Sequence, residues 1–382
     1  MHVWTSHLDG ATWIDEGDAP SSPDLVLYFG STDSVATGQA YASLRERFPD
    51  ALIAGGSTGS TILGTRVDDD TTVSVAMRFE RARVRGATEP IRDAQDSAAC
   101  GARLAAALAA PDLTGVFVLS DGLAVNGTEL VRGMVTVLGE KVSLSGGLAG
   151  DGARFERTLV GLQEAPTDHR VAAIGFYGDS LRMGLAAAGG WDTFGPPRAI
   201  TRSECNVLYE LDGKPALDLY ERYLGEEAEG LPGTALLYPL QIWPPENPDA
   251  SVVRTVLAVD REARTMTFAG AIPQGWQAQL MRGVHENLVS GAADAALAAV
   301  SRHAPARGSS PRVALLVSCV GRRLLMGQRT TDEVEAVHEE FGEGIAQVGF
   351  YSYGEIAPHE RVGSCELHNQ TMTVTLIEEA VA

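Results

Sequence analysis

Compact apolar runs alternate along the first half of the chain with segments whose apolar residues recur at helical spacing. Runs at residues 25–29, 51–54 and 116–119 end at glycine or at a polar turn, which is typical of buried strands. The segments 93–110 and 127–138 gather apolar residues on one helical face. Strands that alternate with helices in this way predict an α/β fold.

The second half of the chain has the same kind of pattern. An alanine-rich helix is expected at 286–303, and a buried strand follows at 313–320. A Thr330-x-x-Glu333 capping box predicts the start of a further helix. Apolar runs on both sides of Gly178-Asp179 predict a hairpin, which makes the sheets mixed. The expected fold class is therefore α/β, with two domains that each have a mixed β-sheet flanked by helices.

A glycine-rich turn follows the apolar run at 141–144. Gly146, Gly147, Gly150 and Gly152 lie within seven residues, and Asp151 is the only charge among them. Glycine allows positive φ and the close approach of other atoms, so this turn is either the wall of a ligand pocket or a site of tight packing. In the pocket reading Asp151 contacts a ligand, and in the packing reading it caps the turn. A similar segment at 55–59 predicts an internal repeat of strand–glycine-turn units.

Length and soft segments set the expected domain organisation. A chain of 382 residues favours two domains over one core. We expect an N-terminal arm at 1–23, a first domain at 24–215 and a second at 216–382, with a glutamate- and glycine-rich zone just after that boundary.

Charge and cysteine content exclude several classes of protein. A formal charge of −20 disfavours nucleic acids and anionic membrane surfaces as partners. The N-terminus lacks the pattern of a secretory signal, and no window is apolar enough for a transmembrane helix. The four cysteines are far apart and form no CxxC pair. We therefore expect a cytoplasmic protein with reduced thiols.

The motifs taken together resemble those of the FIST family of sensory domains. The N-terminal FIST half is matched by Gly55-Gly-Ser-Thr58, Ser120-Asp-Gly122, Ser145-Gly-Gly-Leu-Ala-Gly-Asp151 and Gly190-Trp191. The C-terminal half is matched by Ser318-Cys-Val-Gly-Arg322, Gly349-Phe-Tyr-Ser-Tyr-Gly-Glu-Ile-Ala-Pro358 and Leu367-His-Asn-Gln-Thr-Met372. The family often has an acid soon after its first glycine turn, whereas this chain has Thr58-Gly-Ser-Thr61 there.

The resemblance implies a function in sensing. FIST proteins bind small ligands and pass the signal to partners, often histidine kinases or cyclic-dinucleotide enzymes. Some stand-alone members of similar length bind haem and sense nitric oxide, so haem is a candidate cofactor. We expect a non-enzymatic sensor that binds a small molecule between its two domains and signals to a separate protein. The alternatives are a haem-based nitric-oxide sensor that acts on a histidine kinase and a ligand-free adaptor.

Three positions in the second half have open interpretations. Cys319 ends a buried strand beside Arg322, so it is either a thiol activated by the arginine or a small buried hydrophobe. Arg322 itself binds a ligand carboxylate or neutralises Glu355. Glu355, at a strand end beside Gly354, contacts a ligand or belongs to a buried pair.

A haem reading needs a histidine that faces an apolar cavity. His338 lies on an apolar helical stripe, His359 lies in a loop, and His368 falls on the apolar face of the last strand, with Asn369 on the opposite face. Each of them is more often an ordinary structural or surface histidine.

The ligand site is expected where the glycine turn of the first half meets two segments of the second half. No serine lies in a G-x-S-x-G elbow, and no placed nucleophile and base are evident, so an enzyme is not expected. The predicted ligand-binding residues are Gly146, Gly147, Gly150, Asp151, Trp191, Cys319, Arg322, Gly354, Glu355 and Asn369.

Overall fold

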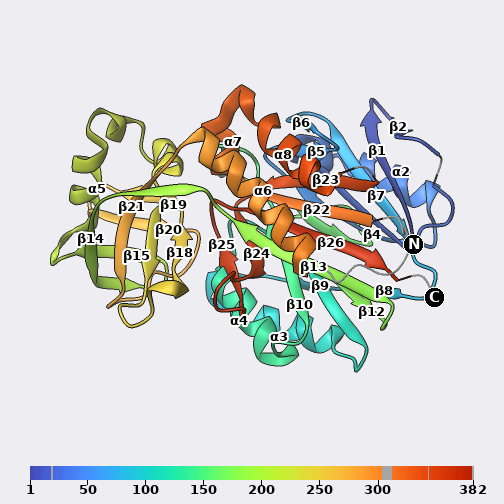
Figure 1. The fold of residues 1–382 in the computed structure, drawn as a ribbon, viewed down its shortest axis with the longest axis horizontal. Helices are drawn as coiled ribbons and strands as arrows, with labels where there is room; N and C mark the ends of the chain where they lie inside the picture. Colours follow the sequence, from blue (N-terminus) through green and yellow to red (C-terminus); the bar gives the residue numbers. More distant parts are fainter. Residues whose placement is uncertain (19, 303–311, 343, 381–382) are drawn as a thin grey trace.

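A computed structural model of the chain describes residues 1–18, 20–302, 312–342 and 344–380. Within these residues the strands form three six-stranded sheets and one eight-stranded sheet. The three six-stranded sheets make up a core, and the eight-stranded sheet forms a separate insert lobe at one end of it, green to yellow in Figure 1. The α/β class expected from the sequence is confirmed.

The first sheet is built mainly from the N-terminal segment. Its strand order is β11 (Val160–Leu162), β4 (Leu52–Ser57), β3 (Leu25–Gly30), β7 (Thr72–Arg78), β1 (His2–Asp9) and β2 (Thr12–Asp15). Helices α1 (Thr32–Ala36) and α2 (Gln39–Arg47) connect β3 to the parallel strand β4. Residues 1–23, expected to be an arm, thus supply two strands of this sheet.

The second sheet comes mostly from the segment that contains the glycine turn. Its order is β25 (Cys365–His368), β24 (Gly354–Pro358), β10 (Ser143–Leu148), β9 (Leu113–Ser120), β12 (Arg170–Tyr177) and β8 (Arg83–Pro90). Helix α3 (Ser97–Leu108), preceded by a short 3-10 turn at Ala94–Asp96, follows β8, and α4 (Gly127–Leu138) connects β9 to the parallel strand β10.

The third sheet is formed by the C-terminal segment. Its order is β13 (Leu181–Ala188), β26 (Met372–Glu379), β22 (Arg312–Cys319), β23 (Ile345–Ser352), β5 (Thr61–Leu63) and β6 (Arg66–Asp68). Helix α6 (His285–Arg302) precedes β22, and α7 (Val320–Met326) and α8 (Thr331–Phe341), with a 3-10 turn at Gly327–Arg329 between them, connect β22 to the parallel strand β23.

The three sheets are copies of one plan. Each has a central parallel pair joined by helices, an antiparallel strand beside it and a further antiparallel strand beyond that. In each copy, the strand that follows the second parallel strand pairs in a neighbouring sheet. Strand β5 of the first copy joins the third sheet, β11 of the second copy joins the first sheet, and β24 of the third copy joins the second sheet. The internal repeat predicted from the two glycine turns is therefore confirmed, and it has three members.

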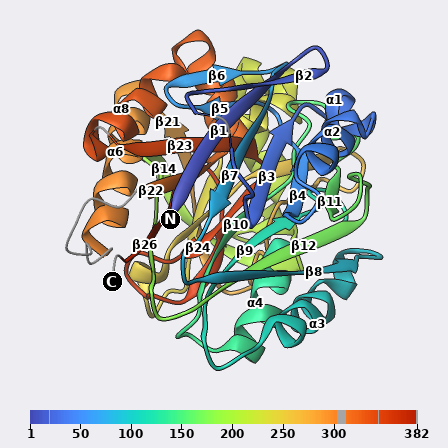
Figure 2. The ribbon, with the colours of Figure 1, turned by 90° about the vertical axis from the view of Figure 1, so that its right-hand side faces the viewer.

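The sheets pack with one face toward a common interior. Phe29, Phe117 and Phe350, one from each sheet, are buried in the same apolar cluster, and the rings of Phe29 and Phe350 stack with centroids 4.6 Å apart. The outer faces are covered by helices, with α1 and α2, α3 and α4, and α6 and α8 on three sides of Figure 2. The exchanged strands and the shared interior tie the three copies into one body.

The insert lobe leaves the third copy between β13 and α6. It contains β14 (Trp191–Glu204), β15 (Val207–Leu211), β16 (Lys214–Pro215), α5 (Ala216–Leu224), 3-10 turns at Gly225–Gly230, Gly233–Leu237 and Pro248–Ala250, β17 (Leu240–Trp243), β18 (Val252–Arg254), β19 (Val256–Asp260), β20 (Thr265–Phe268) and β21 (Gln277–Gly283). The lobe has its own apolar core, in which Leu217 and Phe268 are fully buried. Strands from both sides of residue 215 pair within its one sheet.

Two local predictions were wrong, and a third was confirmed only for the start of the helix. The expected hairpin around Gly178 does not form, because β12 pairs in the second sheet and β13 in the third, so the turn carries the chain between sheets. The expected last strand is two strands, broken where Gln370 adopts φ 66°. Thr330 does precede α8, but the Glu333 carboxylate turns into the core instead of capping the helix. None of the described helices combines the length and apolar character that crossing a membrane requires.

Candidate functional site

The glycine turn after β10 lies at the centre of the core, where the three copies meet. Each copy has a turn at the carboxyl end of its second parallel strand, and one backbone N–H of each turn donates to a carbonyl of the next copy. These bonds are Gly59 N to Tyr351 O at 3.2 Å, Gly150 N to Ser57 O at 3.1 Å and Tyr353 N to Leu148 O at 3.2 Å. The three turns therefore form a hydrogen-bonded ring, which we call the turn ring.

Gly146 and Gly147 are needed for packing. Gly146 has φ 136°, and a Cβ there would lie 2.0 Å from the carbonyl oxygen of Val118 on the neighbouring strand. A Cβ on Gly147 would lie 2.6 Å from Cγ1 of Val317, in the third sheet. Gly147 also pairs with Glu355 in the β10–β24 ladder, so the glycine turn does meet Gly354 and Glu355, as the sequence predicted.

Asp151 caps the turn that follows it. Its carboxylate accepts the backbone N–H groups of Phe155, Glu156 and Arg157 at 2.8–2.9 Å, and the Tyr353 hydroxyl also donates to it. The side chain is buried, and these four donors occupy both of its oxygens. Asp151 therefore has little capacity left for a ligand.

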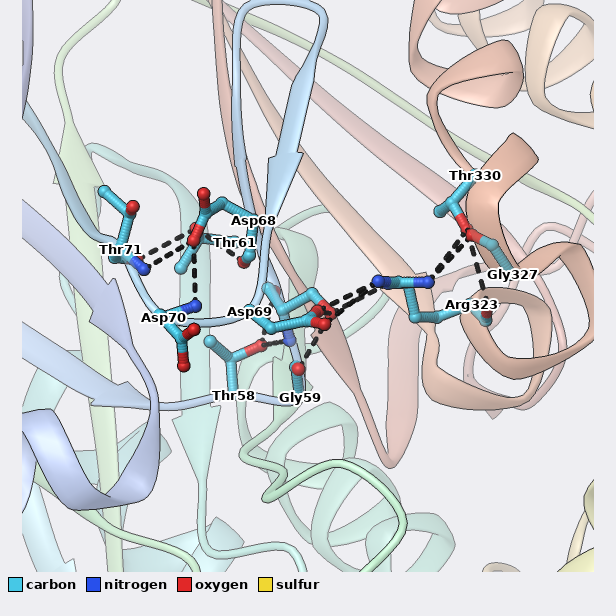
Figure 3. A network of polar contacts seen from close by, with 11 residues as sticks. Thr58, Gly59, Thr61, Asp68, Asp69, Asp70, Thr71, Arg323, Gly327 and Thr330 are labelled. Atoms are coloured by element: carbon cyan, nitrogen blue, oxygen red, sulfur yellow. Dashed lines mark hydrogen bonds and ion pairs between the residues drawn. The ribbon is translucent and has the colours of Figure 1, made fainter.

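A cleft of about 420 Å³ opens beside the turn ring, and ion pairs between copies cross it. Arg323 donates to both carboxylate oxygens of Asp69 at 3.1 Å, to Ser60 Oγ at 3.1 Å and to the carbonyl of Gly327 at 2.9 Å (Figure 3). The loop that holds Asp69 is braced in turn by Asp68, which accepts the N–H groups of the next residues. Arg323 and Asp69 thus pair across this cleft, which is also lined by Asp151.

Arg322 lies in a separate, fully buried network. Its guanidinium pairs with Glu333 at 2.7–2.9 Å, and the other Glu333 oxygen accepts from Ser318 and Tyr351. The remaining N–H groups donate to the carbonyls of Gly189 and Leu288. Because these carbonyls belong to the segments that leave and re-enter the core around the insert lobe, Arg322 clamps both connections. It pairs with Glu333 rather than with Glu355 or an open space.

Cys319 is buried in the interior and lines none of the clefts described here. Burial raises the pKa of its thiol, and the nearby Glu355 acts in the same direction. The neighbouring Arg322 opposes this effect only weakly, so the thiol stays protonated. Its surroundings fit the small-hydrophobe reading.

Glu355 is fully buried and forms no ion pair with any residue that the structure describes; the nearby Arg322 pairs with Glu333 instead. Its carboxyl group bonds to Ser352 Oγ at 2.7 Å, and to the N–H and hydroxyl of Thr371 at 3.2 and 3.0 Å. Burial raises the pKa of Glu355 to about 8, although these hydrogen bonds lower it in part. The side chain therefore carries a proton at neutral pH. Its hydrogen-bond partner Thr371 lies in the wall of a cleft.

That wall belongs to a cleft of about 370 Å³ between the core and the insert lobe, which we call the interlobe cleft. The core contributes His359, His368, Asn369 and Thr371, and the insert lobe contributes Gln241 and residues 251–253. Asn369 is completely buried, and it bonds to Tyr353 O at 3.3 Å and to Thr255 N of the insert lobe at 3.4 Å. The amide thus bridges core and lobe at the edge of an open space.

Trp191 and Gln370 form hydrogen bonds at the boundary between the core and the insert lobe. The Trp191 indole N–H donates to the carbonyl of Gln370 at 2.8 Å, and the Gln370 side chain donates to Leu236 O in the insert lobe. Gln370 is fully buried with positive φ, and its Oε1 has no partner in the described part of the chain. Strained and unpaired polar groups of this kind are concentrated at functional sites.

Two of the three candidate haem ligands line the interlobe cleft. His359 bonds through Nε2 to Ser251 O at 2.9 Å, and its Nδ1 accepts a backbone N–H at 3.2 Å. His368 bonds through Nε2 to Ala357 O at 3.1 Å, and burial lowers its pKa to about 4. His338 lies on α8 and lines none of the clefts described here.

A porphyrin does not fit this arrangement. Haem sites place a histidine nitrogen before a largely apolar slot, whereas this cleft sets charged and amide side chains, Asp249, Glu360, Arg361, Gln241 and Asn369, among its alanines and valines. Both nitrogens of His359 are already engaged. Among the described residues, no group of three or more histidine, cysteine or acidic side chains is arranged to hold a metal ion.

Comparison with protein families assigns the chain. The sequence profile of the FIST N domain matches residues 24–214, and that of the FIST C domain matches residues 216–358. The chain belongs to the FIST family. FIST domains are sensory domains that bind small ligands in signal transduction, rather than catalytic domains. The FIST N and FIST C domains follow one another here, although their strands share sheets.

Other comparisons add little to the FIST assignment. No curated protein matches this chain. Among solved structures, it is similar to "cyanuric acid hydrolase from A. caulinodans" at 12% sequence identity and a TM-score of 0.19, with 78% of this chain and 100% of that one covered. A likeness this low carries no argument about function.

The structure brings some of the predicted residues together and separates others. Trp191, Glu355, Asn369, His359 and His368 gather at or just behind the interlobe cleft. Gly146, Gly147, Gly150, Asp151 and Gly354 lie in the turn ring or the ladder beside it, and Cys319 and Arg322 lie in the interior. Gln241 and Ser251 carry no signal in the sequence, because they come from a lobe whose position against the core is a tertiary feature.

Proposed function

We propose that the chain is a cytoplasmic small-ligand sensor, whose ligand binds in the interlobe cleft and changes how the insert lobe sits on the core. The observation that carries this proposal is the position of Asn369, Thr371 and His368. These buried polar side chains meet an open cleft whose other wall belongs to a different lobe. Ligand sites commonly lie at such boundaries and use a few convergent polar groups.

Polar contacts link the two walls of this cleft, and others tie the lobe to the core elsewhere, such as Gln370 to Leu236 O and Arg254 to Leu367 O. Beside the Asn369 bridge, His359 bonds to Ser251 O and Arg361 pairs with Asp249 at the exposed rim. A ligand held by both walls favours one lobe position over another by its difference in affinity for the two. A separate partner, such as a histidine kinase or a cyclic-dinucleotide enzyme, then reads that position.

The polar wall favours a small hydrogen-bonding ligand over haem. His368 is uncharged at neutral pH, and the wall offers imidazole, amide and hydroxyl groups, with Asp249, Glu360 and Arg361 as its charged side chains. We therefore rank the haem-based nitric-oxide sensor below the sensor of a small polar molecule. A ligand-free adaptor would leave the buried polar wall without a role.

Two measurements test the proposal together. A panel of amino acids, cyclic amides, polyols and haemin is screened for a rise in melting temperature. At a hundredfold excess over Kd, a bound compound adds about 2.7 kcal/mol to the free energy of unfolding. Any active compound is then added to protein labelled at the exposed Cys205 of the insert lobe and at Gln39→Cys in the core, with Cys365→Ser to avoid a third label. We expect a change in the label-to-label distance. A stabilising compound that leaves the distance unchanged would refute the lobe mechanism, and a Soret band with haemin would favour the gas sensor.

A further inference from the structure

A second cleft between core and insert lobe contains a buried cation without a counterion. This cleft, of about 480 Å³, lies between α4 and the insert lobe, and we call it the α4 cleft. Arg254 lines it and is only 3% exposed. Arginine is almost never buried unless it is paired. No carboxylate lies within 4 Å of Arg254 among the residues that the structure describes.

The hydrogen bonds of Arg254 leave one end of its guanidinium unused. Nε donates to Ala271 O at 3.1 Å, and Nη1 donates to Val253 O and Leu367 O at 3.1 and 3.0 Å. Nη2 has no acceptor in the described part of the chain, and it is not among the fully buried atoms that lack a partner. It is therefore the end that the α4 cleft reaches. Three carbonyls fix the orientation of the group and leave its charge unneutralised.

The chain makes room for this arginine. A Cβ on Gly270 would lie 2.8 Å from Arg254 Nε, so the glycine allows the backbone to pack directly on the guanidinium. Burial lowers the pKa of Arg254 to about 10, which still leaves it charged at neutral pH. Charged and oriented before any ligand arrives, it is prepared to bind an anion.

The rest of the α4 cleft is mostly apolar. Val131 and Val135 of α4 face Val252, Pro273 and Trp276 of the insert lobe across it. Its other charged side chains are Glu129 and Arg132, which pair with each other on α4, and Glu366. Glu366 lies beyond ion-pair distance of Arg254 and is the acid that a bound anion would meet.

We propose that the α4 cleft is a second ligand site, which binds a small carboxylate with an aromatic or aliphatic body. The carboxylate accepts from Nη2 of Arg254, and the body packs against Trp276 and the valines. The site is distinct from the interlobe cleft, because Val252 is the one lining residue that the two clefts share among the described residues. Arg254 and Thr255 are consecutive, and they contact the α4 cleft and Asn369 respectively.

Phenylacetate is the probe, and phenylacetamide is the uncharged control of the same shape. Titration calorimetry of the full chain should show binding of phenylacetate and at least tenfold weaker binding of phenylacetamide. Equal affinity for the two probes, or no phenylacetate binding at millimolar concentration, would overturn the proposal.

Variants locate the probe. Arg254→Met keeps an apolar stem and should weaken phenylacetate binding ten- to hundredfold, and Glu366→Gln should strengthen it. If Arg254→Met does not fold, Val135→Trp fills the cleft from α4 and should abolish binding. Asn369→Ala, in the interlobe cleft, should leave it unchanged. Unchanged binding in Val135→Trp, or loss in Asn369→Ala, would contradict a separate site, whatever the fate of the proposed sensor function.

Discussion

The turn ring and the interlobe cleft are both rich in buried polar groups, but those groups find their partners differently. At and beside the turn ring, Asp151 accepts backbone N–H groups of the following turn, and Arg323 donates to Asp69 of a neighbouring loop. At the interlobe cleft, Asn369 makes two long bonds at the edge of an open space. The difference shows that burial of polar residues does not identify a site by itself. A closed network holds a fold together, and an open one leaves capacity for a ligand.

The largest loss of stability should come from breaking the fully buried network of Arg322 and Glu333. Arg322→Leu leaves Glu333 buried without its cation, so we expect a loss of about 3–5 kcal/mol in the free energy of unfolding. Urea denaturation measures it. The double variant Arg322→Leu/Glu333→Leu should lose less than the sum of the two single variants. Additive losses would show that Arg322 and Glu333 are not coupled. They would weaken the contrast between closed polar networks and the open polar groups of the interlobe cleft.

The pH dependence of stability should report Glu355. Its folded pKa of about 8 lies above the unfolded value of about 4.5, so the folded state retains a proton that the unfolded state releases. Its contribution is fully present below pH 4.5 and is lost as the pH rises toward 8, by at most about 1.4 kcal/mol per pH unit.

Glu355→Gln tests this slope, because glutamine does not titrate. Unfolding of the wild type and of this variant is compared at pH 5 and pH 8. The variant should gain stability relative to the wild type at the higher pH. The same difference at both pH values would contradict a protonated Glu355 behind the cleft.

A middle-sized effect is expected for Asp151→Ala. Three backbone N–H groups lose their acceptor, which should cost about 2 kcal/mol in the free energy of unfolding. The matched control is Asp33→Ala, since Asp33 is exposed and makes one weak ion pair, and it should change stability by less than about 0.5 kcal/mol. Equal effects of the two variants would mean that the cap is not structural.

The smallest effect on stability is expected in the open region. Asn369→Ala removes two long hydrogen bonds, and we expect a loss of about 1 kcal/mol. Gln39→Ala, at an exposed position on α2, is the control for loss of an amide side chain. A loss as large as that of Arg322→Leu would show that Asn369 belongs to the architecture and not to a ligand site.

The sequence allowed much of the fold to be predicted, because its signals are local. Alternating apolar runs and helical stripes gave the α/β class, and the two glycine turns indicated a repeat. The exchange of β5, β11 and β24 between sheets was not predictable, since each strand pairs with a partner chosen by tertiary structure. The expected hairpin at Gly178 failed for the same reason, as two adjacent strands joined different sheets.

The candidate site was predictable only in part. The glycine cluster correctly predicted that other atoms come close to the backbone there. A sequence does not show whether those atoms belong to the protein or to a ligand, so Gly146 and Gly147 did not distinguish packing from a ligand pocket. For Arg322 the sequence left a ligand carboxylate and Glu355 as alternative partners, whereas its partner Glu333 lies on another helix and has the pattern of a cap. His368 and Asn369, two candidates from the motif at 367–372, do line the interlobe cleft.

Ligand-induced stabilisation in two variants tests the central claim most directly. Compounds that raise the melting temperature of the wild type are measured on Asn369→Ala and on Asp151→Ala. The interlobe cleft as ligand site predicts that the rise disappears in Asn369→Ala and persists in Asp151→Ala. A rise that persists in Asn369→Ala and disappears in Asp151→Ala would place the ligand at the turn ring and contradict the proposal.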